Sequence, residues 1–215
     1  MLKKKLQWVI DGSGKTSGRL LDVGAGTGHF PFFMQSKGWE VVALEPDDTA
    51  RKVAKEKLKL NILPLEELAR QTENSFDVIT LWHVLEHVHD IEGYVDHFHS
   101  ILKKDGTLII AVPNHTSRDA KHYATKWAAY DVPRHLWHFS PESMNQLLSR
   151  HHFQINEKMD MPLDAFYVSM LSEKYKGNYF FGPVSALFPG LKSYFKGRKQ
   201  KDQASSIIYF SKKNP

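Results

Sequence analysis

The stretch Leu20-Leu21-Asp22-Val23-Gly24-Ala25-Gly26-Thr27-Gly28 decides the fold of this chain. An apolar run with an acidic residue near its end breaks into three alternating glycines, which predicts a strand, a tight turn and the start of a helix. Glycine lets the backbone adopt positive φ angles and lets a ligand approach main-chain N–H groups closely. The stretch therefore predicts a loop that binds a nucleotide-like cofactor.

The spacing of the glycines helps to choose the cofactor. A dinucleotide-binding loop usually reads G-x-G-x-x-G, whereas this chain has G-x-G-x-G with Asp22 two residues before the first glycine. This pattern resembles motif I of the class I S-adenosylmethionine-dependent methyltransferases. The resemblance implies S-adenosylmethionine as cofactor, with S-adenosylhomocysteine as product. The residues that it implies as cofactor contacts in the loop are Asp22, Gly24, Ala25, Gly26 and Gly28.

A second acidic residue supports cofactor binding. The run 41–44 reads as the next strand, and Glu45 follows at its carboxyl end, next to Pro46. A carboxylate there can accept hydrogen bonds from both ribose hydroxyls of a nucleoside. An alternative interpretation is that Glu45 only caps the helix that starts near Asp47. Nicotinamide cofactors also bind strand-end carboxylates, so an NAD-dependent oxidoreductase stays open as an alternative.

Strand-like and helix-like runs alternate from residue 19 to about 113, which predicts a doubly wound α/β sheet with helices on both faces. The methyltransferase resemblance implies a Rossmann-like, seven-stranded, mostly parallel sheet with an antiparallel last strand. Ser140 and Pro141 predict a helix start. The predicted strands are 19–23, 40–44, 60–63, 76–81, 107–112, 153–159 and 204–210, and the predicted helices lie near 29–37, 47–58, 91–103 and 141–150.

Length and composition limit the function classes. With 215 residues and 41% hydrophobic residues, the chain can bury one core, so we expect a single domain over 1–215. Two long connections, 114–139 and 160–203, predict caps over a substrate. The segment 179–189 is unusually apolar for a loop and could line a pocket or touch a partner or a membrane. The chain has no cysteine, which excludes a thiolate metal site or nucleophile.

Charge and hydropathy say more about location than about chemistry. The net charge of +5 comes largely from lysine and arginine runs at 3–5 and 192–201, which we interpret as solvated surface. No RNA- or DNA-binding signature accompanies them, so a nucleic-acid substrate is not expected. No apolar run is long enough to span a bilayer, and no signal-peptide pattern follows Met1. We therefore expect a cytoplasmic protein.

Two short motifs imitate other enzymes. The run 12–16, Gly-Ser-Gly-Lys-Thr, resembles the end of a phosphate-binding P-loop, but Val9 stands where that motif needs glycine. We predict a turn between an N-terminal helix and the first strand. The run 83–87 matches the zinc-protease pattern H-x-x-E-H, but it directly follows a strand and no third ligand is evident. No metal site is predicted.

Two polar segments are the candidates for chemistry. In the resemblance, Trp82 and His83 follow the fourth strand and pass the methionine part of the cofactor, and His87 points at the same pocket. Residues 130–139 concentrate acidic, basic and aromatic side chains before a helix and resemble a segment that lies over the active site of small-molecule methyltransferases. The candidate proton acceptors are His135, His138 and His87, and the candidate substrate contacts are Asp131, Arg134 and Asn114.

These interpretations combine into one expected function. The chain is predicted to transfer a methyl group from S-adenosylmethionine to an oxygen, nitrogen or carbon atom of a small molecule. Alternatives for Trp82, His87 and Arg134 are core packing, a structural hydrogen bond and an ion pair with Asp131. A protein that binds the cofactor but has no activity, or that serves as a partner subunit, is the alternative from another class.

Overall fold

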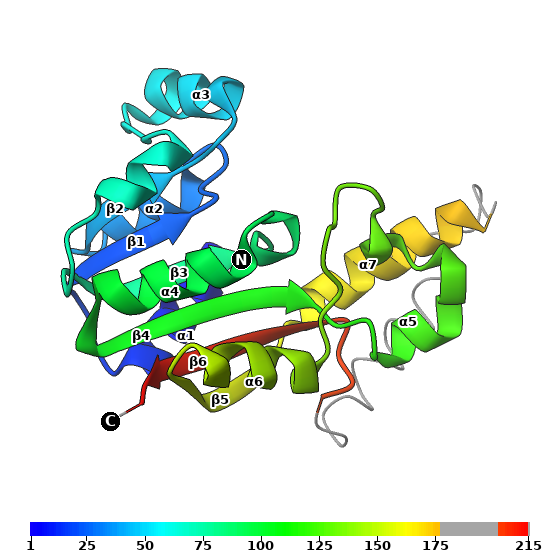
Figure 1. The fold of residues 1–215 in the computed structure, drawn as a ribbon. Coiled ribbons are helices and arrows are strands. Elements are labelled where there is room, and N and C mark those ends of the chain that lie inside the picture. Colours follow the sequence, from blue (N-terminus) through cyan, green and yellow to red (C-terminus); the bar gives the residue numbers. More distant parts are fainter. Residues whose placement is uncertain (177–201, 215) are drawn as a thin grey trace.

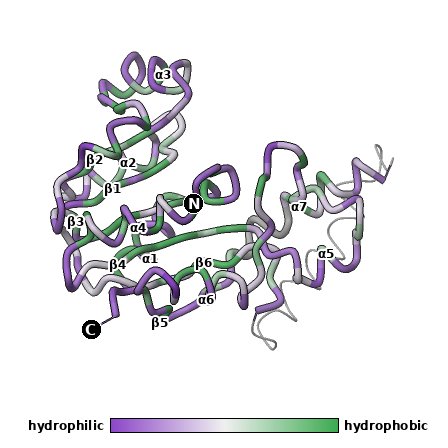
Figure 2. The backbone as a smooth tube through the Cα atoms, viewed as in Figure 1, coloured by the Kyte–Doolittle hydropathy of each residue, from purple (hydrophilic) through white to green (hydrophobic). Residues whose placement is uncertain are grey.

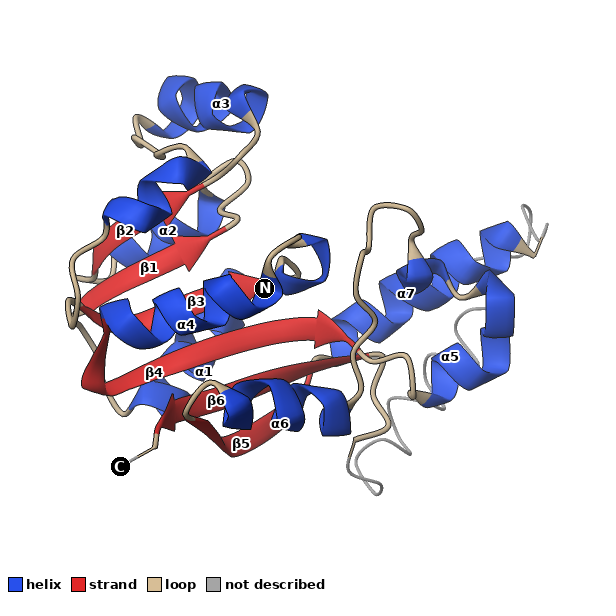
Figure 3. Ribbon diagram, in the orientation of Figure 1, coloured by secondary structure: helices blue, strands red, loops and turns tan. Residues whose placement is uncertain are grey.

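A single sheet with helices on both faces forms the body of the protein (Figures 1 and 3). The structure is a computed structural model, and it describes residues 1–176 and 202–214. Among them no helix has both the length and the apolar character that crossing a bilayer requires. The apolar segment 179–189 and most of the predicted cap 160–203 lie outside the described residues.

Helices and strands alternate as expected. The strands are β1 (Arg19–Val23), β2 (Glu40–Leu44), β3 (Phe76–Trp82), β4 (Leu102–Pro113), β5 (Phe153–Asp160) and β6 (Ser206–Lys213). The α-helices are α1 (Leu2–Ser13), α2 (His29–Gln35), α3 (Asp48–Leu58), α4 (Ile91–Ile101), α5 (Arg118–Tyr123), α6 (Pro141–Arg150) and α7 (Pro162–Tyr175). Short 3₁₀ turns are η1 (Leu65–Arg70), η2 (Leu85–His87), η3 (Ala124–Lys126) and η4 (Ala128–Tyr130).

The strand order is β2-β1-β3-β4-β6-β5. The first four strands in this order pair in parallel, and β6 pairs antiparallel with both β4 and β5. The predicted doubly wound, mostly parallel α/β sheet is therefore confirmed. Because parallel strands end at the same edge, the loops that follow β1, β2 and β3 lie together, where ligands bind in such folds.

Alternating side chains of the central strands supply both faces of the sheet. Leu20, Val78 and Ile109 pack with α1 and α2, whereas Leu21 and Ile79 point to the other face, which α4 and α6 cover. Figure 2 shows the hydrophobic residues concentrated along the strands. Successive side chains of a strand point to opposite faces, so a sheet that is buried on both faces requires apolar residues at successive positions.

The predicted strand 60–63 is wrong, and the sheet has six strands in the described residues instead of seven. Only Leu63 bridges to Leu44, in parallel. Leu63 N–H donates to Ala43 O and Glu45 N–H donates to Leu63 O, at 2.9 and 3.0 Å. Pro64 follows and has no N–H to donate, so the ladder stops after these two hydrogen bonds.

A small helical layer lies beyond the carboxyl end of β4 (Figure 1). Helices α5 and α7 and turn η4 pack around the buried rings of Tyr123 and Trp127 and the side chain of Val168. Ser172 Oγ of α7 accepts a hydrogen bond from Ala128 N–H at 2.8 Å. Parts of the predicted segments 114–139 and 160–203 are thus packed together, and their role as a substrate cap stays a prediction.

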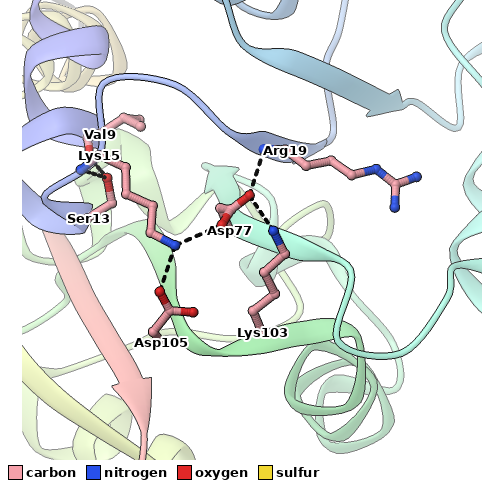
Figure 4. Close-up of polar contacts among 7 residues, drawn as sticks. All are labelled: Val9, Ser13, Lys15, Arg19, Asp77, Lys103 and Asp105. Atoms are coloured by element: carbon pink, nitrogen blue, oxygen red, sulfur yellow. Dashed lines mark hydrogen bonds and ion pairs between the residues drawn. The ribbon is translucent and has the colours of Figure 1, made fainter.

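An ion-pair cluster around Asp77 joins the amino ends of the strands, as Figure 4 shows. Asp77 accepts hydrogen bonds from Arg19 N–H and from the ammonium groups of Lys15 and Lys103, at 2.7 to 2.8 Å. Lys15 also binds Asp105 at 2.8 Å. Lys15 is the lysine of the P-loop-like run, and it lies at the sheet edge opposite the glycine loop. The turn that we predicted at 12–18 is found at 14–18, because Gly12 and Ser13 still belong to α1.

The cluster predicts a specific acid sensitivity. Burial raises the pKa of Asp77, but the Arg19 N–H and the lysines Lys103 and Lys15 outweigh it and hold the pKa at about 2. A carboxyl with a depressed pKa stabilises the folded state above its unfolded pKa, and the stabilisation is lost as the pH falls through about 2. We expect Asp77→Asn to lower the free energy of unfolding at pH 7 by about 2 kcal/mol, measured by urea denaturation.

Asp105→Asn is the matched control, because its side chain is 73% exposed and binds the same lysine. A loss below about 0.5 kcal/mol is expected there. The difference between wild type and Asp77→Asn should shrink as the pH is lowered from 4 toward 2. Equal losses in both variants, or a difference independent of pH, would contradict the assignment.

Candidate functional site

The glycine loop between β1 and α2 has the geometry of a ligand cradle. Gly24, Gly26 and Gly28 have φ angles of 74°, 54° and 82°, which residues with a side chain rarely adopt. A Cβ at Gly24 would lie 2.3 Å from Val84 Cγ2, and one at Gly28 would lie 2.9 Å from Leu60 Cδ2. A Cβ at Gly26 would meet no atom within 4 Å. The backbone at Gly26 is thus open to a ligand.

Glu45 lies beside this open backbone. The Glu45 carboxylate accepts hydrogen bonds from Gly26 N–H at 2.7 Å and from Asp47 N–H at 3.0 Å. Helix α3 is capped by Asp47, whose side chain accepts from Thr49 N–H, so Glu45 is not the helix cap. Each carboxylate oxygen has a further lone pair for a hydroxyl donor. Arg51 donates to the carbonyls of Glu45 and Pro46 and so holds this turn.

Asp22 is a buried acidic residue at the end of β1. It is 2% exposed and accepts a hydrogen bond from the Thr80 hydroxyl at 2.7 Å. Burial raises the pKa of Asp22 to about 7, although the Thr80 hydrogen bond and the charge of Lys5 favour the ionised form. An acid with this pKa gains strongly from a cation placed next to it.

Lys5 is a site residue that the sequence analysis missed. Its ammonium lies over the rings of Trp82 and Phe30, at 4.5 and 5.2 Å from their centres. Burial lowers the pKa of Lys5, and Asp22 opposes this shift. Our interpretation of 3–5 as solvated surface is therefore wrong for Lys5, because α1 turns this residue toward the sheet. Apolar Leu2, Leu6 and Val9 at helical spacing around Lys5 were the available signal.

Trp82 packs as its structural alternative predicted and also has an unused donor. Its ring contacts Trp8 and Phe30, with ring centres 6.1 and 5.7 Å apart. The buried Trp82 Nε1 donates no hydrogen bond within the described residues. His83, which follows, has a φ of 59° and donates its N–H to Ala111 O. An orphaned donor, an open glycine backbone and two acidic residues suit a polar, cationic cofactor.

A second group of polar side chains adjoins the first. The segment 131–137 docks on η2, where Leu136 N–H and Trp137 N–H donate to Glu86 O. His87 Nδ1 lies 2.9 Å from Arg134 O, and His135 Nδ1 lies 2.8 Å from Ala129 O. The two imidazole rings are in edge contact, 4.7 Å between centres. The structure therefore brings together two of the three predicted histidines.

The other predicted residues of this region are placed differently. Arg134 is paired with Asp131 at 2.8 Å, which the structural alternative anticipated, and its side chain is 75% exposed. His138 makes a different contact, with Nε2 3.0 Å from Tyr130 O, and its side chain is exposed. The Asn114 side chain bonds to Thr116 and to the carbonyls of Asp202 and Ala204. No observation tests the predicted substrate roles of these residues.

Residues 4–158 match the sequence profile of the family described as "Methyltransferase domain". The match covers more than half of the chain, which therefore belongs to this methyltransferase family. The predicted resemblance to the class I S-adenosylmethionine-dependent methyltransferases is thereby confirmed.

Named relatives and solved structures agree with the family. The mitochondrial ubiquinone biosynthesis O-methyltransferase of Bos taurus is 27% identical over 69% of this chain and 44% of its own. The corresponding Aeromonas salmonicida enzyme is 32% identical over 55% of this chain and 52% of its own. The chain thus spans about half the length of these curated relatives.

The fold agrees with solved structures across nearly the whole chain. A SAM-dependent methyltransferase from Archaeoglobus fulgidus superposes with a TM-score of 0.64 and 19% identity, covering 99% of this chain and 93% of the other. The 1,6-didemethyltoxoflavin-N1-methyltransferase of Burkholderia thailandensis gives a TM-score of 0.62 and 15% identity, covering 100% and 78%. At these identities the likeness concerns the fold.

The open backbone at Gly26 generates a prediction. We expect Gly26→Ala to weaken S-adenosylhomocysteine binding at least tenfold, because the added methyl group points where the ligand would approach. The left-handed φ also costs about 1 kcal/mol of stability for a residue with a side chain. Calorimetric titration gives the affinity, and thermal melting gives the stability.

Gly14→Ala is the matched control. Gly14 has a φ of 70°, and a Cβ there also meets no atom within 4 Å. This glycine ends α1 at the other edge of the sheet, so the variant should lose similar stability and keep full affinity. If both variants bound the ligand equally well, the loop would not be the cofactor site.

Proposed function

We propose that this chain transfers the methyl group of S-adenosylmethionine to a nucleophilic atom, foremost a hydroxyl oxygen, of a small molecule. The observation that carries the proposal is the open backbone of Gly26 beside the buried carboxylate of Glu45, at the carboxyl ends of β1 and β2. The methyltransferase family membership supports the donor. The O-methyltransferase names of the curated relatives support an oxygen acceptor. A cytoplasmic location stays a prediction.

Donor binding would use the first group of residues. Glu45 accepts the ribose hydroxyls, and the loop of Gly24, Ala25, Gly26 and Gly28 together with Pro46 surrounds the nucleoside. Asp22 balances the positive charge of the amino-acid part, and Trp82 and His83 flank it. The ammonium of Lys5 lies over the rings of Phe30 and Trp82, beside this part of the site. When bound, S-adenosylmethionine supplies an activated methyl group.

Acceptor binding would use the second group. In His87 and His135, Nδ1 donates to a backbone carbonyl. The lone pair of Nε2 is then available to accept the hydroxyl proton of the small-molecule substrate. Asp131 and Arg134 flank the two histidines, His138 lies at the rim, and Asn114 holds the turn after β4. Such a proton acceptor contributes about 10²–10⁴-fold to rate, and orientation of donor and acceptor contributes more.

The first experiment measures ligand binding by calorimetry. We expect S-adenosylmethionine and S-adenosylhomocysteine to bind with one site per chain, and NAD and ATP not to bind. Turnover is then followed with hydroxylated aromatic acceptors in place of an unknown substrate. Binding without turnover on any acceptor would favour a non-catalytic partner protein. Binding of NAD in place of the methyl donor would favour an oxidoreductase and contradict the proposal.

The raised pKa of Asp22 predicts a pH-dependent affinity for the donor. Only the ionised carboxylate attracts the cationic ligand, and ionisation increases as the pH rises toward about 7. Between pH 5.5 and 7.0 the affinity of wild type for S-adenosylmethionine should rise about tenfold. This range lies below the usual pKa of an α-amino group, about 7.7–8.0, so the ligand keeps its charge.

Asp22→Asn keeps the size of the side chain and removes the titration, so its affinity should be low and nearly independent of pH. Asp77→Asn, at the opposite edge of the sheet, should retain the dependence of wild type. If the dependence survived in Asp22→Asn, another group would carry it.

A further inference from the structure

Glu86, His87 and His135 form a cluster outside the proposed donor site. It shares His87 and His135 with the proposed acceptor site, and a metal ion on their Nε2 atoms would replace their role as proton acceptors. Each offers one ligand atom, and the three atoms lie within 4.8 Å of one another. Glu86 and His87 come from η2 and His135 comes from the segment docked on it, so the cluster exists only in the folded chain. No local sequence pattern reveals this cluster, because His87 and His135 are 48 positions apart.

The Glu86 carboxylate is buried but accepts no hydrogen bond from the residues that the structure describes. The Glu86 side chain is 1% exposed. His83 Nδ1 lies 3.3 Å from Oε1. A buried carboxylate is costly unless a positive charge or hydrogen-bond donors compensate it. A metal ion supplies such compensation.

Both imidazoles have the hydrogen-bonding pattern of a histidine that binds a metal through Nε2. A carbonyl oxygen accepts but does not donate, so the contacts of Nδ1 with Arg134 O and Ala129 O place the proton on Nδ1 in both rings. The lone pair is then on Nε2. A histidine ligand usually donates its other N–H to a carbonyl or a carboxylate in this way.

We propose that Glu86, His87 and His135 bind a divalent transition-metal ion of the zinc type. Two imidazole nitrogens with one carboxylate suit such ions, whereas Mg²⁺ and Ca²⁺ prefer oxygen ligands. Zinc bonds of about 2.0–2.2 Å require the ligand atoms to approach one another by about 1 Å. The exposed His87 provides a path for the ion. Three protein ligands leave a position open for water or an acceptor oxygen.

This proposal departs from the sequence-based prediction that there is no metal site. The pattern H-x-x-E-H was set aside as a zinc motif because it directly follows a strand and because no third ligand was evident. In the structure Glu86 and His87 of this pattern meet His135 from the later segment, and the cluster does not include His83. Any ion would therefore sit between two loops instead of on one helix.

The test is a titration of the full chain, without an affinity tag and after dialysis against a chelator, with Zn²⁺ by calorimetry and with Co²⁺ by visible absorption. We expect one tight site per chain and a Co²⁺ spectrum typical of nitrogen and oxygen ligands. Glu86→Gln and His87→Ala should each weaken binding at least tenfold. The exposed His87 makes its variant safe for folding if Glu86→Gln does not fold.

His99→Ala with His152→Ala is the matched control, because these two histidines also lie near each other, 5.9 Å between ring centres. This double variant should bind Zn²⁺ like wild type. Equal affinity in wild type and His87→Ala, or an equal loss in the control, would overturn the proposal. Metal binding is measured without donor or acceptor, so its result is independent of the proposed methyl transfer.

Discussion

The parallel register of β1, β2 and β3 is the constraint on which the remaining structure depends. Val23 is paired with Leu44 on one side and with Leu81 on the other, so the three strands end at the same level. The glycine loop, Glu45 and Trp82 therefore follow one another along a single edge of the sheet. Side chains that are far apart in sequence therefore lie close together at this edge, because the strand pairing alone places them there.

The two ends of the strands each carry a buried acidic residue, and the surroundings shift the two pKa values in opposite directions. At the amino ends, Asp77 is surrounded by donors and has a depressed pKa. At the carboxyl ends, Asp22 is buried with few donors and has a raised pKa. The first arrangement stabilises the folded state at neutral pH, whereas the second costs stability there. The proposed donor site thus lies at the end of the sheet where the buried carboxylate is less well compensated.

Much of the fold was predictable from the sequence, because strong local signals coincide with it. The apolar run before the glycines predicted the bounds of β1, the run before Glu45 predicted those of β2, and Ser140 with Pro141 predicted the start of α6. The strand prediction for 60–63 was wrong. An apolar run can equally belong to a segment that packs against a helix, and Pro64 prevents further strand pairing. Leu60 and Ile62 are buried against Ala54 of α3, and sequence patterns do not show that contact.

Sequence patterns indicated the residues that lie together in one loop, but not those brought together from two separate segments. The glycine loop and Glu45 are recognised by spacing alone. Lys5 escaped notice because its neighbours are exposed lysines, and burial depends on how α1 rests against the sheet. The meeting of Glu86 with His135 depends on the hydrogen bonds of Leu136 and Trp137 to η2, which no local pattern specifies.

The position of α1 has a consequence for the order in which the chain can assemble. Lys5 contacts Trp82, and Lys15, two residues after α1, contacts Asp105. Helix α1 therefore cannot complete its docking until the chain has been synthesised at least as far as Asp105. During synthesis the apolar face of α1 stays exposed, or is covered by other molecules, until the central strands have formed.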